Sequence, residues 1–191
     1  MIKHIFLDFF GVCASEVSPV WLRAHMSEEE AIAYKADVVQ KVDEGKLSYR
    51  ELLDYLSDKS GVPACQINKE WHDLSFCHDD FIAFMRDLKR CYDIYLLSNA
   101  SSEFLRSLLD KHQLNDLFTR VFISAEIKLV KPHADYFEHA LKELGFQPGE
   151  CVFIDDNPIN CEGAEKVGIH AIRYQNAKQV EADLAALGVK R

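Results

Sequence analysis

Polar side chains stand directly after three apolar runs of the sequence, where the end of a strand could hold a reactive group. They are Asp8 after residues 5–7, Ser98 and Asn99 after residues 93–97, and Asp155 and Asp156 after residues 151–154. Short, nearly continuous apolar runs are typical of buried parallel strands. Because the carboxyl ends of such strands meet at one edge of a sheet, we expect these side chains to converge there, together with Lys131 from a later connection.

Three carboxylates and a lysine in one crevice indicate a site for a hard cation and an anionic substrate. Asp8 alone could be an ordinary turn or helix-cap residue, but polar residues at successive strand ends are harder to explain in that way. Asp155 and Asp156 repel each other unless a cation offsets their charge, and Mg²⁺ prefers oxygen ligands of this kind. With Lys131 adding positive charge, the site would suit phosphate, and Asp8 could attack it as a carboxylate nucleophile.

The elements that would place these groups alternate between strand-like and helix-like segments from residue 81 onward. Strands are predicted at residues 93–97, 120–123, 151–154 and 169–172, and helices at 81–89, 103–112, 134–144, 158–167 and 178–187. Strands that alternate with helices of this length predict a parallel sheet with helices on both faces. The expected fold class is therefore α/β.

Residues 15–80 interrupt this alternation and contain no good strand. Residues 28–42 show helical periodicity, with Ser27 as the predicted N-cap. Ser48 and Glu51 have the spacing of a capping box, which predicts another helix up to the stop at Gly61. With a further short helix that follows, this stretch is predicted to be an all-helical insertion.

The composition excludes several classes of protein. The 191 residues suffice for one domain with a small insertion, and 48% of them are hydrophobic. A net charge of −9 argues against a nucleic-acid partner, which would need a basic surface. No apolar run approaches the ~20 residues of a membrane span, no signal peptide is visible, and the six cysteines form no C-x-x-C pair. We therefore expect a cytoplasmic protein without a membrane partner, acting on a small anionic molecule.

Four motifs follow one another along the chain. They are Ile5–Asp8 with Gly11-Val12, Leu96–Asn99, Lys131-Pro132 and Val152–Asn160. In this order and spacing they resemble the motifs of the haloacid dehalogenase superfamily, mostly Mg²⁺-dependent phosphatases that form an aspartyl-phosphate. The resemblance implies a Rossmann-like core domain of residues 1–14 and 81–191 and a small helical cap domain of residues 15–80.

The resemblance also implies a role for each polar residue. Asp8 would be the nucleophile, and Mg²⁺ would be bound by Asp8, the backbone carbonyl of Phe10 and Asp156, with Asp155 in support. The catalytic residues Ser98 and Lys131 would bind the phosphoryl group together with Asn99, and Asn160 would hold the fourth motif in place. The expected reaction is Mg²⁺-dependent hydrolysis of a small phosphorylated metabolite.

Phe10 is the departure from this pattern. Phosphatases of the superfamily have Asp-x-Asp in the first motif, whereas this chain has Asp8-Phe9-Phe10. The second aspartate normally protonates the leaving oxygen and then activates water, and such acid–base help contributes roughly 10²–10⁴-fold in rate. Phenylalanine can do neither, although its backbone carbonyl could still bind a metal.

Three functions remain open at this point. The leading one is a phosphatase that acts on good leaving groups, such as acyl phosphates, or takes its acid from the cap. The second is a carbon–halogen hydrolase, because halide leaves without a proton and the dehalogenase branch has an aromatic residue at this position. That branch uses no metal, however, and lacks the paired acids found here at positions 155 and 156. The third is a protein that binds a phosphorylated ligand or a partner with little turnover.

Five further residues have two interpretations each. His25, Glu28, His72 and His78 of the cap are candidates for the replacement acid, or else ordinary polar residues. Lys128 stands where the family often has glycine. It is either a solvated surface charge or an added positive charge at the mouth of the pocket.

Overall fold

A five-stranded parallel sheet forms the centre of the protein. The computed structural model describes residues 1–190. The strands are β1 (His4–Leu7), β2 (Asp93–Ser98), β3 (Arg120–Ile123), β4 (Cys151–Asp155) and β5 (His170–Arg173). Their order is β3-β2-β1-β4-β5, and every neighbouring pair is parallel. The predicted α/β fold with a Rossmann-like sheet is confirmed.

The central strand β1 determines where along the strand direction the site lies. Residues 5–7 are fully buried, as expected for a strand that is covered on both faces. Leu7 pairs with Leu96 of β2 and with Ile154 of β4. The next residue, Asp8, therefore lies level with the residues that end these two strands. The strand order reverses between β1 and β4, which is where open α/β sheets bind their ligands.

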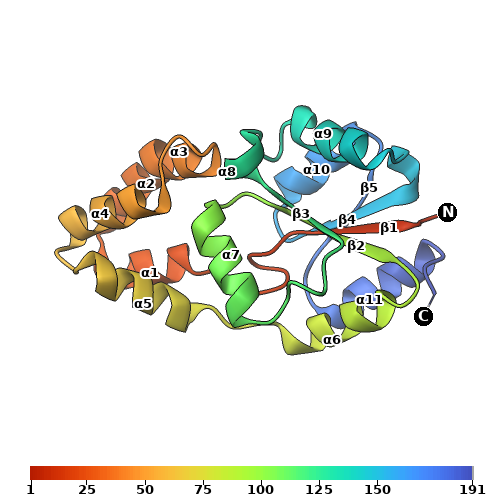
Figure 1. Ribbon diagram of the computed structural model, residues 1–191, viewed down its shortest axis with the longest axis horizontal. Helices are drawn as coiled ribbons and strands as arrows, with labels where there is room; N and C mark the ends of the chain where they lie inside the picture. Colours follow the sequence, from red (N-terminus) through yellow and green to blue (C-terminus); the bar gives the residue numbers. More distant parts are fainter. Residues whose placement is uncertain (191) are drawn as a thin grey trace.

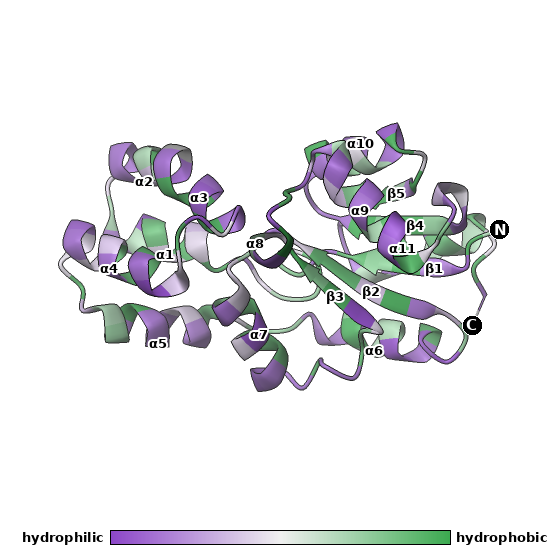
Figure 2. Ribbon diagram, turned by 45° about the horizontal axis from the view of Figure 1, so that its top comes forward, coloured by the Kyte–Doolittle hydropathy of each residue, from purple (hydrophilic) through white to green (hydrophobic). Residues whose placement is uncertain are grey.

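Helices cover both faces of the sheet (Figure 1). On one face lie α6 (Asp79–Leu88), α7 (Ser102–Lys111) and α11 (Ala177–Ala186), and on the other α9 (Ala134–Leu144) and α10 (Pro158–Lys166). Side chains of β1 alternate between the two layers, since Ile5 and Leu7 pack in the first core cluster and Phe6 in the second. Figure 2 shows apolar strands between helices with hydrophilic outer surfaces. A short helix, α8 (Ser124–Ile127), and a 3₁₀ turn, Pro148–Glu150, complete this part of the chain.

The residues between β1 and α6 form a second group of helices beyond the carboxyl edge of the sheet (Figure 1), and we call this group the cap and the rest the core. Its helices are α1 (Ser18–His25), α2 (Glu28–Tyr34), α3 (Gln40–Asp43), α4 (Tyr49–Ser60) and α5 (Ala64–Leu74), and the π-helical segment Lys35–Val39 joins α2 to α3. The insertion is all-helical, as predicted. The division into a core domain of 1–14 and 81–191 and a cap domain of 15–80 stays a prediction.

Helices α2 and α4 of the cap begin at the residues that the sequence predicts. At Ser27 and Ser48 the hydroxyl accepts the N–H three residues further on. The predicted N-cap at Ser27 and the predicted capping box at Ser48 are both present, and Ser27 also forms a capping box, with Glu30. Gly61 ends α4 with a φ of +73°. The helix predicted over residues 28–42 extends to Asp43 but widens into the π-helical segment at its middle.

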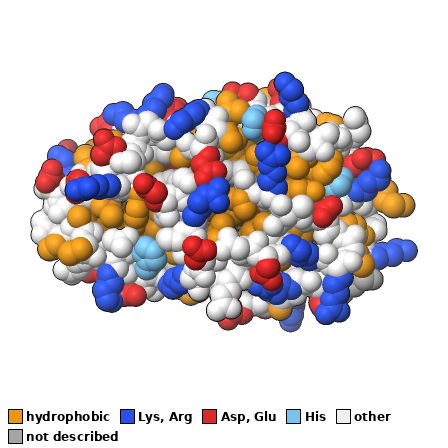
Figure 3. All heavy atoms as spheres, viewed as in Figure 1, with side chains coloured by type: hydrophobic (Ala, Val, Ile, Leu, Met, Phe, Trp, Pro, Cys, Tyr) orange, Lys and Arg blue, Asp and Glu red, His pale blue; other side chains and the backbone are white. Residues whose placement is uncertain are grey.

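The surface mixes both signs of charge. Figure 3 shows acidic and basic side chains interspersed over the face that it presents. Since the chain carries a net charge of −9, any positive site for an anion has to be local. Within residues 1–190, no helix combines the length and the apolar character that crossing a bilayer requires.

Candidate active site

A buried lysine lies between two carboxylates at the carboxyl edge of the sheet. The Nζ atom of Lys131 is 3.0 Å from Oδ2 of Asp8 and 2.7 Å from Oδ2 of Asp155. The side chains of Lys131 and Asp155 are fully buried, and Asp8 is only 9% exposed. Burial lowers the pKa of Lys131, but the two carboxylates more than offset this, so that the pKa lies above its ordinary value. Three residues predicted to meet at this edge are therefore in direct contact.

Asn99, directly after β2, holds the backbone of this lysine. Its Nδ2 donates to the carbonyl of Lys131 and its Oδ1 accepts the N–H of Lys131, both at 2.9 Å. The Lys131–Pro132 peptide is cis, and Gly163 of α10 lies against it. A Cβ at position 163 would be 2.4 Å from the carbonyl oxygen of Pro132, so the missing side chain lets α10 approach this loop. The predicted contact of Asn99 with substrate oxygens stays a prediction.

The two adjacent acids after β4 have different surroundings. Oδ1 of Asp155 accepts the N–H of Asn157 at 2.8 Å, and its Oδ2 accepts from Nδ2 of Asn160 at 3.0 Å, besides the lysine. Asn160 thus holds the fourth motif in place, as predicted. Asp156 is half-buried and lies against Gly11. Gly11 has a φ of +75°, and a Cβ there would lie 2.6 Å from Cγ of Asp156, so the turn requires glycine.

The three carboxylates fit a hard dication. Asp8, Asp155 and Asp156 each offer an oxygen, and these oxygens all lie within 4.8 Å of one another. Burial raises the pKa of Asp8 well above its ordinary value against the opposing effect of the lysine, and burial together with Asp155 raises the pKa of Asp156. A dication would relieve this excess of negative charge with the oxygen ligands that Mg²⁺ prefers. Because Asp8 and Asp156 line the cavity described below while Asp155 is fully buried behind them, Asp8 and Asp156 are better placed as direct ligands.

Ser98 ends β2 with a buried hydroxyl. Its Oγ has no hydrogen-bond partner within residues 1–190, a state that costs about 1–3 kcal/mol. Ser98 itself does not line the cavity described next, but the three residues that follow it do. The predicted contact of Ser98 with the phosphoryl group stays a prediction.

A cavity of about 770 Å³ separates these groups from the cap. From the core it is lined by Asp8, Phe10, Asn99, Phe104, Lys131 and Asp156, among others. From the cap it is lined mainly by the apolar or aromatic residues Val17, Tyr34, Val39, Val42, Tyr49, Leu52 and Trp71. The rings of Tyr49, Trp71 and Phe104 lie with their centroids 5.2 to 6.3 Å apart. A cavity of this volume is typical of a binding site for a small metabolite.

Comparison with known proteins identifies the family. Residues 2–168 match the haloacid dehalogenase-like hydrolases. The chain belongs to this family. The D-ribitol-5-phosphate phosphatase of Bacteroides thetaiotaomicron is 22% identical over 98% of both chains. The (S)-2-haloacid dehalogenase 4A of Burkholderia cepacia is 25% identical over 87% of this chain and 72% of its own.

Solved structures share the fold of this chain. A HAD family enzyme from Bacteroides thetaiotaomicron superposes with a TM-score of 0.81, at 24% identity over 99% of both chains. The complex of that enzyme with magnesium and inorganic phosphate gives a TM-score of 0.78, at 23% identity over 92% of this chain and 95% of the other. The haloacid dehalogenase-like hydrolase described here therefore shares its fold with these enzymes.

Phe10 forms part of the cavity wall in this hydrolase. Its ring lies 5.0 Å from that of Phe9 and stacks against Phe104 at 6.1 Å, measured between centroids. No titratable side chain stands at position 10. A proton for a leaving group has to come from another residue or from water.

None of the four predicted replacement acids lines the cavity. His25 stacks on Trp21, and Glu28 is exposed in the first turn of α2. The ring nitrogens of His72 are hydrogen-bonded to the Asn68 carbonyl and to Ser107 Oγ. Nδ1 of His78 is hydrogen-bonded to the Val12 carbonyl. Their side chains are used in packing and local hydrogen bonds, or point to solvent. The interpretation of these four as ordinary polar residues is the correct one.

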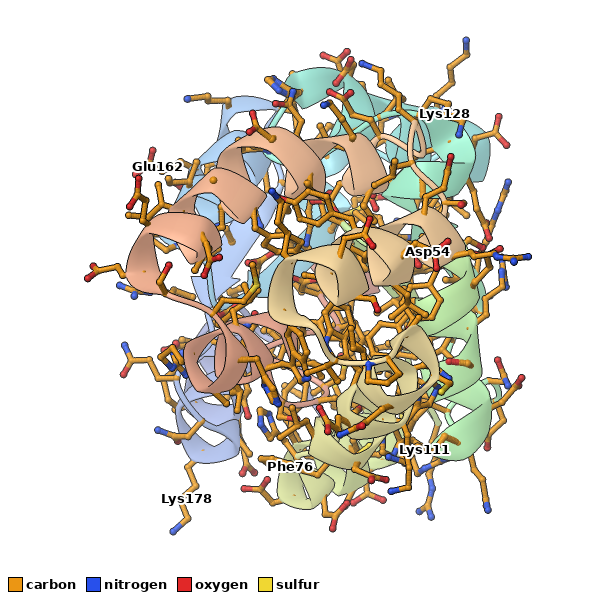
Figure 4. All side chains as sticks on the ribbon, turned by 90° about the vertical axis from the view of Figure 1, so that its left-hand side faces the viewer. Asp54, Phe76, Lys111, Lys128, Glu162 and Lys178 are labelled. Atoms are coloured by element: carbon orange, nitrogen blue, oxygen red, sulfur yellow. The ribbon has the colours of Figure 1, made fainter. Side chains whose placement is uncertain are left out.

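Lys128 also lies outside this cavity. It is an exposed residue (labelled in Figure 4), and its Nζ donates to the carbonyl oxygen of Gly45 in the cap at 2.8 Å. Its backbone has a φ of +60°, a conformation that glycine adopts more easily. Lys128 is thus a surface charge that connects the core to the cap.

Two carboxylates that the sequence did not predict as site residues also line the cavity. They are Glu16, just after the first motif, and Asp43, the last residue of α3. An acid at the end of a charged helix is usually solvated, so no signal in the sequence distinguished Asp43 from its neighbours. Its burial becomes visible only once the cap is folded over the sheet.

Proposed function

We propose that this hydrolase is a Mg²⁺-dependent phosphatase, which hydrolyses a small phosphorylated metabolite through an aspartyl-phosphate on Asp8. The observation that carries the proposal is that Asp8, Asp156 and Lys131 open into one cavity while their charges remain unbalanced without a cation. The similarity to a D-ribitol-5-phosphate phosphatase, and to an enzyme crystallised with magnesium and inorganic phosphate, supports it.

The ion would be held by Asp8, the backbone carbonyl of Phe10 and Asp156, with Asp155 in support. When bound, Mg²⁺ would offset the negative charge of the phosphoryl oxygens. The chain itself orients the nucleophile, because the N–H of Phe9 donates to Oδ1 of Asp8 at 2.7 Å and Lys131 holds Oδ2. Lys131 remains protonated beside two carboxylates and binds a phosphoryl oxygen, as does the free hydroxyl of Ser98.

The reaction then has two displacements at phosphorus. The carboxylate of Asp8 attacks, and the bond from phosphorus to the alcohol oxygen breaks. Water next attacks the phosphorus of the aspartyl-phosphate, which releases inorganic phosphate and restores the carboxylate. With an ordinary alcohol as the leaving group, each displacement also needs a proton transfer, which Phe10 cannot provide.

Phosphate release from an activated aryl phosphate tests this function. We expect the wild-type protein to release phosphate with Mg²⁺ and not with a chelator, and Asp8→Asn to lose the release to background. Asp54→Asn is the matched control, because Asp54 is an exposed aspartate of α4 (Figure 4) and should leave the rate unchanged. Release that needs neither the metal nor Asp8 would refute the proposal.

A carbon–halogen hydrolase is the second candidate. The aromatic wall that Phe10 forms beside Asp8 and the similarity to a 2-haloacid dehalogenase favour it. We expect no chelator-insensitive release of halide from a panel of short 2-haloacids. Such release, dependent on Asp8, would establish this function in place of the phosphatase.

A binding protein with impaired chemistry is the third candidate, favoured by the missing acid at position 10. Phe10→Asp separates it from the leading proposal. If this change raises phosphatase turnover by orders of magnitude from a near-zero baseline, the native protein is not an efficient phosphatase. Fast turnover by the wild-type protein excludes the binding-only role.

A further inference from the structure

We propose that Asp43 of the cap is the general acid and general base of this hydrolase, in the role that position 10 leaves vacant. The inference rests on the phosphatase function proposed above. It would make the cap a source of catalytic chemistry as well as of substrate contacts.

The geometry of displacement at phosphorus places the leaving oxygen on the cap side of the site. Attacking and leaving oxygens lie roughly in line through phosphorus. Asp8 attacks from the core wall of the cavity, so the leaving oxygen points across the cavity toward the opposite wall. Asp43 belongs to that wall, as the final residue of α3. A proton donor in the cap is therefore on the correct side of the phosphoryl group.

Among the titratable residues of the cap, five line the cavity: Glu16, Tyr34, Lys35, Asp43 and Tyr49. Burial raises the pKa of Tyr34 to about 12 and that of Tyr49 above its ordinary value, so both phenols are poor acids near neutral pH. Lys35 is exposed. Burial raises the pKa of Glu16 too, but the charges that act on it most are Asp156 and Asp155, which puts it on the metal side. Asp43 is the remaining carboxyl.

The surroundings of Asp43 favour its protonated form. Burial raises the pKa of Asp43 to about 7, with Lys131 opposing the shift and Glu44 adding to it. Tyr34 and Tyr136 are the other titratable groups that sense its charge, and Tyr136 senses Asp8 and Asp155 as well. A group that is half protonated near neutral pH suits both halves of an acid–base cycle.

The proton balance closes over the two displacements. In the first, the carboxylic acid of Asp43 gives its proton to the alcohol oxygen as the phosphorus–oxygen bond breaks. In the second, the Asp43 carboxylate takes a proton from the water that attacks the aspartyl-phosphate. Inorganic phosphate leaves, the carboxylate of Asp8 is restored, and Asp43 is again protonated. No other reactant is needed.

Substrates that differ only in the leaving group test this role. An activated nitrophenyl phosphate loses a stable anion and needs no acid, whereas phenyl and alkyl phosphates do. For Asp43→Asn we expect kcat/KM for phenyl phosphate to fall roughly 10²-fold or more. We expect kcat/KM for nitrophenyl phosphate to change far less, with a burst of nitrophenolate followed by slow turnover, because hydrolysis of the intermediate also lacks its base.

The pH profile gives a second readout. The acid acts in its protonated form, so wild-type kcat/KM for phenyl phosphate should fall as the pH rises through about 7, and Asp43→Asn should lose this limb. Adding Phe10→Asp to Asp43→Asn should restore activity toward phenyl phosphate, because it returns an acid next to Asp8. Asp54→Asn, in the same cap but exposed, should behave as wild type.

The outcomes separate this inference from the function on which it rests. If Asp8→Asn abolishes nitrophenyl phosphate turnover but Asp43→Asn keeps wild-type kcat/KM for phenyl phosphate, the role of Asp43 is refuted and the phosphatase stands. If the wild-type protein shows no turnover that depends on Mg²⁺ and Asp8, both are refuted. Retained kcat/KM of Asp43→Asn for nitrophenyl phosphate also shows that the variant is folded.

Discussion

Lys131 neutralises part of the charge of a buried acidic cluster, and this makes it a structural as well as a chemical residue. Its ammonium is in contact with Asp8 and Asp155 inside the protein. Removing one partner of such a buried group leaves a charge that neither water nor protein compensates. The stability of the core therefore depends on the same side chain that we propose to bind phosphate.

Lys131→Met should lower the free energy of unfolding by about 3–5 kcal/mol at neutral pH without Mg²⁺. Lys131 opposes the rise that burial causes in the pKa of Asp8, so without the ammonium this pKa lies further above its value in the unfolded chain. The loss in the free energy of unfolding is therefore present at neutral pH. It shrinks as the pH falls toward ~4, where the carboxyl groups become protonated in the folded and the unfolded state. Urea unfolding at several pH values measures it. Lys178→Met, at an exposed position (Figure 4), should stay within ~0.5 kcal/mol of wild type.

Gly11 sets the position of Asp156 by its lack of a side chain. Gly11→Ala should destabilise the fold by about 1–3 kcal/mol through its positive φ, and should also displace the Asp156 carboxylate. Gly61→Ala is the matched control, because Gly61 has a φ of +73° with nothing within 4 Å of the added Cβ. Only Gly11→Ala should raise the Mg²⁺ concentration needed for half-maximal activity. An equal effect of both changes would contradict this role of Gly11.

At the scale of elements, the continuous helical stretch from α2 through α3 supplies much of the cap wall. Its π-helical middle carries Val39, and its last residue is Asp43. With the aromatic residues of α4 and α5, this stretch gives the cavity an apolar side opposite the charged one. A phosphate ester with an apolar alcohol part would fit this cavity, with its phosphate at the charged core side and its alcohol part at the apolar cap side.

Val39→Asn should reduce the preference for apolar esters, because it places an amide in the apolar wall. We expect kcat/KM for naphthyl phosphate to fall by about tenfold relative to that for glycerol phosphate. Ile32→Asn is the control, since Ile32 lies on α2 but is 62% exposed and away from the cavity. If the two esters lose kcat/KM equally, the wall does not select the alcohol part.

The elements that the sequence predicted best are those with strong local signals. The strands, the N-cap at Ser27 and the capping box at Ser48 could be predicted directly, because buried apolar runs and N-cap chemistry are properties of a few adjacent residues. Helix α1 has only two buried residues and α8 only four residues in all, so neither has a distinct periodic pattern. The convergence of Asp8, Lys131 and Asp155 followed from topology alone.

The position of the cap over the sheet could not be predicted in the same way. It depends on contacts between residues that are far apart in the chain, such as the bond from Lys128 to Gly45 and that from the N–H of Tyr49 to Glu103. Three of the four candidates for the replacement acid are histidines, whose ordinary pKa is near neutral. Burial raises the pKa of Asp43 into the same range. This burial depends on the contact between cap and core, which the sequence does not predict.

For the whole molecule, the site exists only where cap and core meet. The chain enters and leaves the cap through two adjacent segments, in which Ala14 and Cys77 pair antiparallel and the N–H of Ser15 donates to the carbonyl of Phe76 at 2.9 Å. The core contributes the carboxylates and the lysine, and the cap contributes the apolar wall and Asp43. On this account the core provides the attack on phosphorus, while the cap selects and protonates the leaving group.

The most direct test of this account is to trap the covalent intermediate. The protein is mixed with nitrophenyl phosphate and Mg²⁺, quenched in acid during turnover and examined by mass spectrometry of the intact chain and its peptides. We predict one phosphoryl group per chain, on the peptide that contains Asp8, absent with a chelator and absent in Asp8→Asn. Turnover without any such adduct, or with the phosphoryl group on another residue, would contradict the central claim.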